Sequence, residues 1–307
     1  MAKTFDSTLA FFVNQLDKFD EKLHMPLFDT TWPRDINLLE GLSMANESAS
    51  FVRGKIGGSG TQNAQGIPWI SANTNAIPGV SVDGDRIVTP INLCGRTLSY
   101  SSVELERSQL MGQSIDRQKY DAMITLYNLS ADQMVYVGDG NSTGLVNSPE
   151  VLAGNVTGGA WATKTPDEIL DDVNAAIEAA WKASGYAVCP DKLLLPPEQY
   201  ALICSRKVSN DASKSIATYL EESSIALRRN GRKLDIQSCK WLDKAGAGET
   251  ARMVAYTNKV DYVRFPMVPI RRETPYYEGI TFYAPYIWSM GAVQFVYPET
   301  AIYRDGI

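Results

Sequence analysis

The chain has 307 residues and a formal net charge of −6 at pH 7, and this length suffices for two domains or one elaborated domain. Hydrophobic residues make up 44% of the chain and charged residues 21%, so we expect a folded protein. Proteins dedicated to DNA or RNA binding carry a basic surface. The acidic balance argues against that class and leaves room only for a local basic face.

Cysteine and histidine usage argues against a disulfide framework and a metal centre. Cys94, Cys189, Cys204 and Cys239 are widely spaced and never form a C-x-x-C pair, so we expect reduced thiols in a cytosolic protein. His24 is the single histidine, and no G-x-S-x-G nucleophile motif is present. We therefore predict no catalytic residues, no cofactor and no metal. No cleavable signal pattern or membrane-length apolar run is apparent, so no membrane is expected as a partner.

Two unusual segments open the chain. Residues 1–49 are expected to form an N-terminal arm, with an amphipathic helix over 5–23. Residues 50–84 carry seven glycines among Ser, Asn and Thr, between the short β-prone segments Ser50–Arg53 and Arg86–Leu93. A connection this long and this poor in local structure is either disordered or functional. We expect a neighbouring chain to order it.

A long helix follows, and we expect it to act as a structural spine. Ser101 and Glu104 form the capping-box pattern of a helix start. Between Val103 and Leu129 there is no proline, so the helix is expected to reach roughly 40 Å at 1.5 Å per residue. It leads into the turn 138–144, whose glycines are suited to positive φ angles. The turn lacks the lysine of a P-loop, which argues against phosphate binding there.

Helices and strands then alternate. The sequence predicts helices beginning at Pro166 and Pro197 and a third helix over Asp211–Arg229. The acidic pairs Asp171-Asp172 and Glu221-Glu222 are expected on solvated helix faces. The predicted strands are Lys192–Leu195, Leu234–Trp241, Arg252–Thr257, Tyr262–Phe265, Ile280–Ala284 and Ala292–Tyr297. These patterns predict an α+β fold.

One dense basic cluster precedes the later strands. It contains Arg228, Arg229, Arg232 and Lys233. One interpretation is favourable charge at a helix C-terminus before Gly231. The other is a contact with a neighbouring subunit or with nucleic acid, and the sequence leaves both open.

This order of segments resembles the major capsid proteins of tailed bacteriophages with the Johnson fold (Hong Kong 97-type). The resemblance rests on the arm, the glycine-rich loop, the spine, the turn with Gly138-Asp139-Gly140 and Gly144-Leu145-Val146-Asn147, and the ending Ile302-Tyr303-Arg304-Asp305-Gly306. It covers essentially the whole chain, and the arrangement carries it more than any single motif.

The resemblance implies four parts and a set of contacts. These are an arm (1–49), an extended β-hairpin loop (50–84), a peripheral domain with the spine helix (85–144 and 266–307) and an axial domain (145–265). Some relatives cross-link a loop lysine to an asparagine, but only Lys55 is matched here, so that chemistry is not carried over. The expected intersubunit contacts are Arg53, Lys55, Ile67, Trp69, Arg228, Arg229 and Arg232.

The implied function is a shell protein that assembles into hexamers and pentamers of an icosahedral head enclosing double-stranded DNA. The implied partners are other copies, portal and scaffold or decoration proteins, and packaged DNA held without sequence specificity. The implied location is the virion, with assembly in the host cytoplasm. Three alternatives remain open: an encapsulin-type compartment loaded with enzyme cargo, a cytosolic hydrolase with a converging polar pocket, and a nucleic-acid-binding module.

Overall fold

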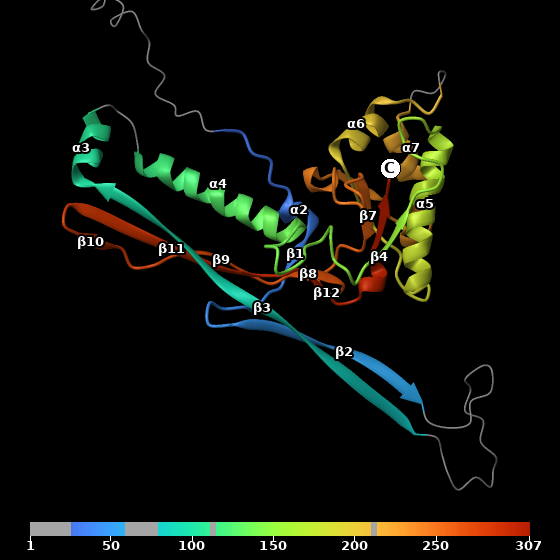
Figure 1. Cartoon of the computed structure of the whole chain (residues 1–307), viewed down its shortest axis with the longest axis horizontal. Helices are drawn as coiled ribbons and strands as arrows, with labels where there is room; N and C mark the ends of the chain where they lie inside the picture. The colour runs from blue at the N-terminus through green and yellow to red at the C-terminus, as the bar shows by residue number, and fades with distance from the viewer. Residues whose placement is uncertain (1–25, 59–78, 111–114, 210–213) are drawn as a thin grey trace, which may run out of the picture. The chain divides into compact units, whose positions relative to one another are not determined.

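The computed structural model describes residues 26–58, 79–110, 115–209 and 214–307 (Figure 1). They fall into two compact units. The first unit comprises the described parts of Met1–Thr30, Gly95–Ser130 and Ile270–Ile287. The second comprises the described parts of Thr31–Cys94, Ala131–Pro269 and Trp288–Ile307. Helices occur together with mixed and antiparallel sheets, which confirms the predicted α+β class.

The second unit is built on a five-stranded sheet in the order β4-β13-β7-β5-β6. Strand β7 runs antiparallel to β13 and β5, whereas β4 and β6 add in parallel at the two edges. The C-terminal strand thus belongs to this sheet, although the sequence grouped residues 266–307 with the spine helix. The strands are β4 (Leu152–Asn155), β5 (Lys192–Leu195), β6 (Asp235–Ser238), β7 (Arg252–Tyr256) and β13 (Ile302–Asp305).

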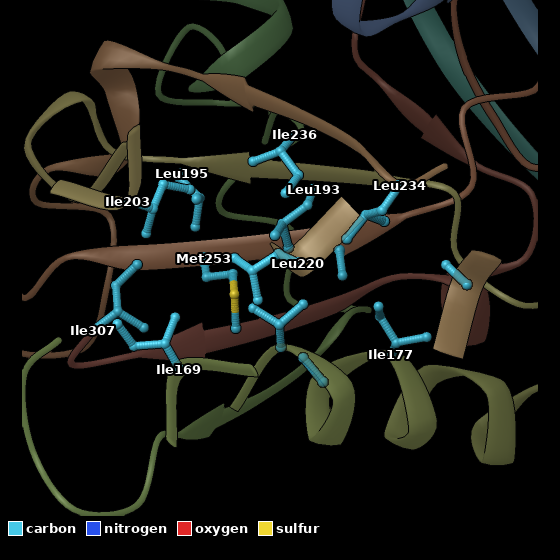
Figure 2. Close-up of a cluster of buried hydrophobic side chains, with 14 of the residues drawn as sticks. Ile169, Ile177, Leu193, Leu195, Ile203, Leu220, Leu234, Ile236, Met253 and Ile307 are labelled. Carbon is cyan, nitrogen blue, oxygen red and sulfur yellow. The ribbon is translucent and has the colours of Figure 1, made fainter. Parts of the chain in front are cut away.

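The main hydrophobic core lies between this sheet and its helices. Thr165 and Glu168 form the reciprocal capping box that begins α5, as predicted. Ile177 of α5 then packs in one buried cluster with Leu193 of β5 and Met253 of β7 (Figure 2). The helices of this unit are α5 (Pro166–Ala183), α6 (Pro197–Ser205), α7 (Ile216–Ser223) and α8 (Ile225–Asn230).

Two boundaries differ from the sequence prediction. The helix predicted over 211–229 is two helices, because Ser224 between α7 and α8 is extended, with ψ 151°. Residues 210–213 lie outside the described part. The strand predicted over 234–241 ends at Ser238 and is followed by a helical turn, η1 (Lys240–Leu242). A second such turn, η2 (Pro298–Thr300), precedes β13.

A three-stranded sheet in the order β1-β8-β12 completes the second unit. Strand β1 (Asn37–Leu38) pairs in parallel with β8 (Val263–Phe265). Strand β12 (Gln294–Phe295) pairs antiparallel on the other side of β8. The short helix α2 (Trp32–Asp35) comes immediately before β1. The residues expected in the arm therefore include structured segments from Trp32 onward.

The third sheet contains a long antiparallel hairpin. Strands β2 (Ser48–Gly58) and β3 (Val80–Ser101) pair from Ser48 opposite Pro90 to Gly58 opposite Val80. Both strands are far longer than the short segments predicted from sequence, because the ladder continues through Gly54 opposite Gly84. The expected hairpin is thus present, and residues 59–78 lie outside the described part. The sheet order is β10-β11-β3-β2, with β9 also paired to β11; the remaining strands are β9 (Met267–Arg272), β10 (Tyr276–Glu278) and β11 (Thr281–Gly291).

The spine region contains two described helices, α3 (Ser102–Leu110) and α4 (Ile115–Tyr136). Residues 111–114 lie outside the described part, so the prediction of one unbroken rod stays a prediction. In the first unit, Lys119 of α4 donates to Glu104 of α3 at 2.9 Å and to the Ser99 carbonyl at 2.8 Å. This lysine fixes the first turn of α3 relative to α4.

Candidate assembly surfaces

The segment entering the second unit is fixed by a buried carboxylate, Asp35. Its Oδ1 lies 3.1 Å from the Lys192 ammonium and 2.8 Å from Arg34 Nε. Tyr136 donates its hydroxyl hydrogen to Oδ2 of the same carboxylate, and Tyr256 donates to the Asp35 carbonyl at 2.5 Å. Burial, together with the nearby Cys239 and Asp35, raises the pKa of Tyr136 well above its ordinary value, so this hydroxyl stays a donor at pH 7.

A second buried carboxylate, Asp132, holds the same segment. It accepts from the backbone N–H groups of Thr31 at 3.0 Å and Trp32 at 3.2 Å. It also accepts from Trp241 Nε1 at 2.7 Å. Thr31 and Trp32 begin α2, where backbone N–H groups lack helical partners, so a carboxylate satisfies them. The sequence pattern gave no sign of either network, because its members are far apart in the chain.

The hairpin base is pinned to the second unit by the buried side chain of Gln294. Its amide nitrogen donates to the Ala49 carbonyl at 3.1 Å and to Thr89 Oγ1 at 3.0 Å. Its amide oxygen accepts from Arg264 Nε at 2.9 Å. A single side chain from β12 therefore bonds to both strands of the hairpin, at the paired residues Ala49 and Thr89.

Beyond that base, the hairpin exposes apolar side chains. Val52, Val80, Val82 and Val88 are 64%, 77%, 71% and 53% exposed. A two-stranded ribbon is marginally stable on its own in water. Within the described residues, more than half of each of these valines is left exposed. The distal hairpin therefore exposes apolar side chains of the kind that mark interaction surfaces.

The contact residues predicted on the hairpin fall into three groups. Arg53 is half-buried and bonds within its own chain, to the carbonyls of Phe295 at 3.0 Å and Val296 at 3.2 Å and to Glu150 at 3.1 Å. Lys55 lies on β2 opposite Asp83. Ile67 and Trp69 lie outside the described residues.

The basic cluster lies at a helix C-terminus before Gly231, as one of the two interpretations of the sequence predicted. Helix α8 ends at Asn230, and Gly231 adopts φ +68°. Arg228, Arg229 and Arg232 are all exposed. Arg229 lies over the Trp181 ring, 5.8 Å from the ring centroid. The structure thus brings Arg229 and Arg232 to the same end of α8.

One acidic residue was misplaced by the sequence analysis. Asp172 was expected on a solvated helix face, but it is buried and bonded to Trp161 Nε1 at 2.9 Å and to the Lys164 ammonium at 2.5 Å. Asp171 is exposed, as expected. The pair splits because adjacent helical residues point about 100° apart, so one faces the core.

Cysteine placement agrees with the sequence analysis, since all four cysteines are free thiols. Among the described residues, no group of three or more His, Cys, Asp or Glu side chains is placed to hold a metal ion. Each helix in the described ranges is too short or too polar to cross a lipid bilayer.

Comparison with known proteins indicates the family and the fold of the chain. A family model described as "Major capsid protein" matches residues 66–307. Among curated proteins, no sequence matches this chain. The capsid of Myoviridae phage XM1 has a TM-score of 0.78 at 16% identity, with 96% of this chain and 98% of that chain covered.

Two further solved structures share the fold. The capsid of a native GTA particle has a TM-score of 0.64 at 12% identity, covering 98% of this chain and 99% of that chain. A virus-like particle from Pyrococcus furiosus has a TM-score of 0.52 at 15% identity, covering 99% of this chain and 100% of that chain. At these identities the likeness establishes the fold, the one predicted from the order of the segments. Since the family model spans well over half of the sequence, the chain belongs to the major capsid protein family.

Proposed function

We propose that this capsid protein assembles with copies of itself into hexamers and pentamers of an icosahedral phage head that encloses double-stranded DNA. The observation that carries the proposal is the distal β2–β3 hairpin, with Gln294 fixing its base and exposed valines beyond. Burial of apolar surface stabilises association by about 25 cal/mol per Å² removed from water. In a shell built from copies of one chain, a neighbouring copy lies next to each subunit and can cover the exposed valines of its hairpin.

In the proposed mechanism, the base of the hairpin is held by its own chain and the distal part contacts a neighbouring copy. Arg53 and Gln294 hold the base to their own chain. The strand that carries Lys55, together with Ile67 and Trp69, is proposed to contact the neighbour. Arg228 is exposed, and we propose that it also contacts a neighbouring copy, next to Arg229 and Arg232.

The chain is proposed to act structurally and without catalysis, as befits a capsid family. Its net charge of −6 supports contact with packaged DNA that is weak and independent of sequence. Portal and scaffold or decoration proteins are the further proposed partners. The proposed location is the virion, after assembly in the host cytoplasm.

The test is electron microscopy of the expressed full chain, alongside Val82→Asp and Val260→Asp. Both valines are exposed, but Val260 lies in a turn outside the hairpin strands. We expect closed particles for the unmodified chain and for Val260→Asp, and unassembled subunits for Val82→Asp. A compact monomer that never assembles contradicts the proposal, as do particles unaffected by Val82→Asp. Particles that co-purify with a specific enzyme cargo contradict the phage-head function in favour of a compartment.

A further inference from the structure

A cavity of about 290 Å³ lies in the second unit, at the C-terminal end of α8. Its lining includes Arg229 and Arg232 from that end, Asp191 before β5, and Thr257 and Lys259 after β7. Three chain segments that are distant in sequence thus contribute polar groups to one hollow. Its volume is at the small end of the range for ligand sites.

The cavity is built by specific contacts. Gly231, at φ +68°, turns the chain so that Arg229 and Arg232 line the same space. Asn230 between them donates to the carbonyls of Cys189 at 3.2 Å and Pro190 at 3.4 Å, which ties the end of α8 to the segment before β5. These bonds fix the backbone on which the two guanidinium groups are mounted.

The charge of the lining is positive. Arg229, Arg232 and Lys259 are cations, and Asp191 is the one carboxylate in the lining. Asp191 Oδ1 already accepts from the Asn258 N–H at 3.0 Å. Burial raises the pKa of the Cys189 thiol to about 11, so this lining residue is neutral at pH 7. The surplus is two positive charges, in a chain whose formal net charge is −6.

Thr257 supplies the second, independent observation. The residue is 1% exposed, and its Oγ1 has no hydrogen-bond partner among the described residues. A buried hydroxyl without a partner is unfavourable, and such groups in native proteins call for an explanation. Because Thr257 belongs to the cavity lining, an oxygen-rich ligand bound there would give this hydroxyl an acceptor and the three cations a counter-charge.

A neighbouring cavity limits what the ligand can be. It has a volume of about 390 Å³, shares Ala187, Val188 and Tyr262, and carries the acidic residues Asp261 and Glu299. A long polyanion such as a DNA strand that continued in this direction would meet like charge. A compact anion held within the first cavity does not extend toward these carboxylates.

We propose that the cavity lined by Arg229, Arg232, Thr257 and Lys259 binds a small oxyanion of the phosphate class. The two arginines and the lysine balance its charge, and the Thr257 hydroxyl donates to one of its oxygens.

The test is calorimetric titration of the unassembled full chain with inorganic pyrophosphate, at about 150 mM salt to screen weak surface binding. Arg232→Gln and Lys259→Gln should each weaken binding about tenfold or more, since each removes one charged hydrogen-bond partner. The matched control is Lys233→Gln, because Lys233 is next to Arg232 and exposed but lies outside the lining. It should bind like the unmodified chain.

Thr257→Val keeps the shape of the side chain and removes the hydroxyl. It should fold normally, as judged by circular dichroism, and bind pyrophosphate several-fold more weakly. Unchanged binding in this variant and in Arg232→Gln overturns the proposal, as does the absence of binding to the unmodified chain. Tighter binding of a DNA oligonucleotide, lost in the same variants, overturns it in favour of a backbone contact. Equal binding of an oligoglutamate peptide overturns it in favour of a carboxylate site on a neighbouring copy. None of these results depends on shell formation, so failure here leaves the proposed function standing.

Discussion

Arg252 and Asp305 lie directly opposite each other on β7 and β13 and form a buried two-pronged ion pair. Arg252 Nε is 2.6 Å from Asp305 Oδ1, and Nη2 is 2.9 Å from Oδ2. The pair is extended on both sides, because Asp305 Oδ2 accepts from the Ala247 N–H at 3.0 Å and Arg252 Nη1 donates to the Val146 carbonyl at 2.7 Å. The C-terminal strand is thus tied to the sheet and to the segment that follows the spine.

Replacing Asp305 with Ala should lower the free energy of unfolding by about 3–5 kcal/mol, because it leaves the Arg252 charge buried and unpaired. The measurement is urea unfolding of the unassembled chain. The control is Glu222→Gln, which removes the exposed Lys214–Glu222 pair and should cost less than about 1 kcal/mol. Equal losses for the two variants would show that the buried pair contributes no more than an exposed one.

Stability should decline in mildly alkaline solution because of the buried thiols. Burial raises the pKa of Cys239 to about 12, whereas a thiol in the unfolded chain ionises near pH 8.5. The folded state therefore keeps a proton that the unfolded state releases. The stabilisation is fully present below about pH 8.5 and is lost as pH rises toward the folded pKa, by about 1.4 kcal/mol per pH unit for each such thiol.

Urea unfolding at pH 8 and pH 10 measures this slope. Cys239→Ala should flatten it, while Cys204→Ala, which removes an exposed thiol, should leave it unchanged. A slope that is the same in Cys239→Ala and in the unmodified chain would contradict the role given to burial.

The turn after the spine offers a matched pair of glycines. Gly138 and Gly140 have nearly equal φ angles, +88° and +89°. A Cβ at Gly138 would lie 2.0 Å from the Ser142 carbonyl oxygen, whereas a Cβ at Gly140 meets nothing within 4 Å. Gly140→Ala should cost only the left-handed conformation, about 1 kcal/mol. Gly138→Ala should cost clearly more in thermal unfolding, and equal costs would mean that the contact with Ser142 relaxes freely.

Local signals in the sequence predicted the elements whose cause is local. Thr165, Pro166 and Glu168 form a helix start from neighbouring residues alone, and the capping box is present as predicted. Gly231 ends α8 for the same reason. The break at Ser224 was missed because the segments flanking the two serines, Ser223 and Ser224, favour a helix; in the fold Ser224 is the N-cap residue of α8, and the Ile225 N–H donates to Asn174 Oδ1 at 3.0 Å.

Partners distant in sequence account for the other errors. The glycine content of residues 50–84 by itself indicated a segment poor in local structure, and the β-hairpin was predicted only from the resemblance; Gly54 and Gly84 lie opposite each other in its ladder. Asp172 was assigned to solvent because its buried partners, Trp161 and Lys164, lie on a segment before α5. The sequence predicted that a neighbouring chain orders this loop, but the anchoring of its base by Gln294 could be found only in the folded chain.

The most direct test of the account is hydrogen exchange along the β2–β3 hairpin, compared between unassembled subunits and closed particles. The account predicts that amides beyond the base fixed by Gln294 exchange rapidly in the subunit and at least about tenfold more slowly in the particle, while β5 and β7 are equally protected in both. Hairpin amides that are equally protected in the lone subunit would show that the hairpin needs no neighbour, and would contradict the central claim.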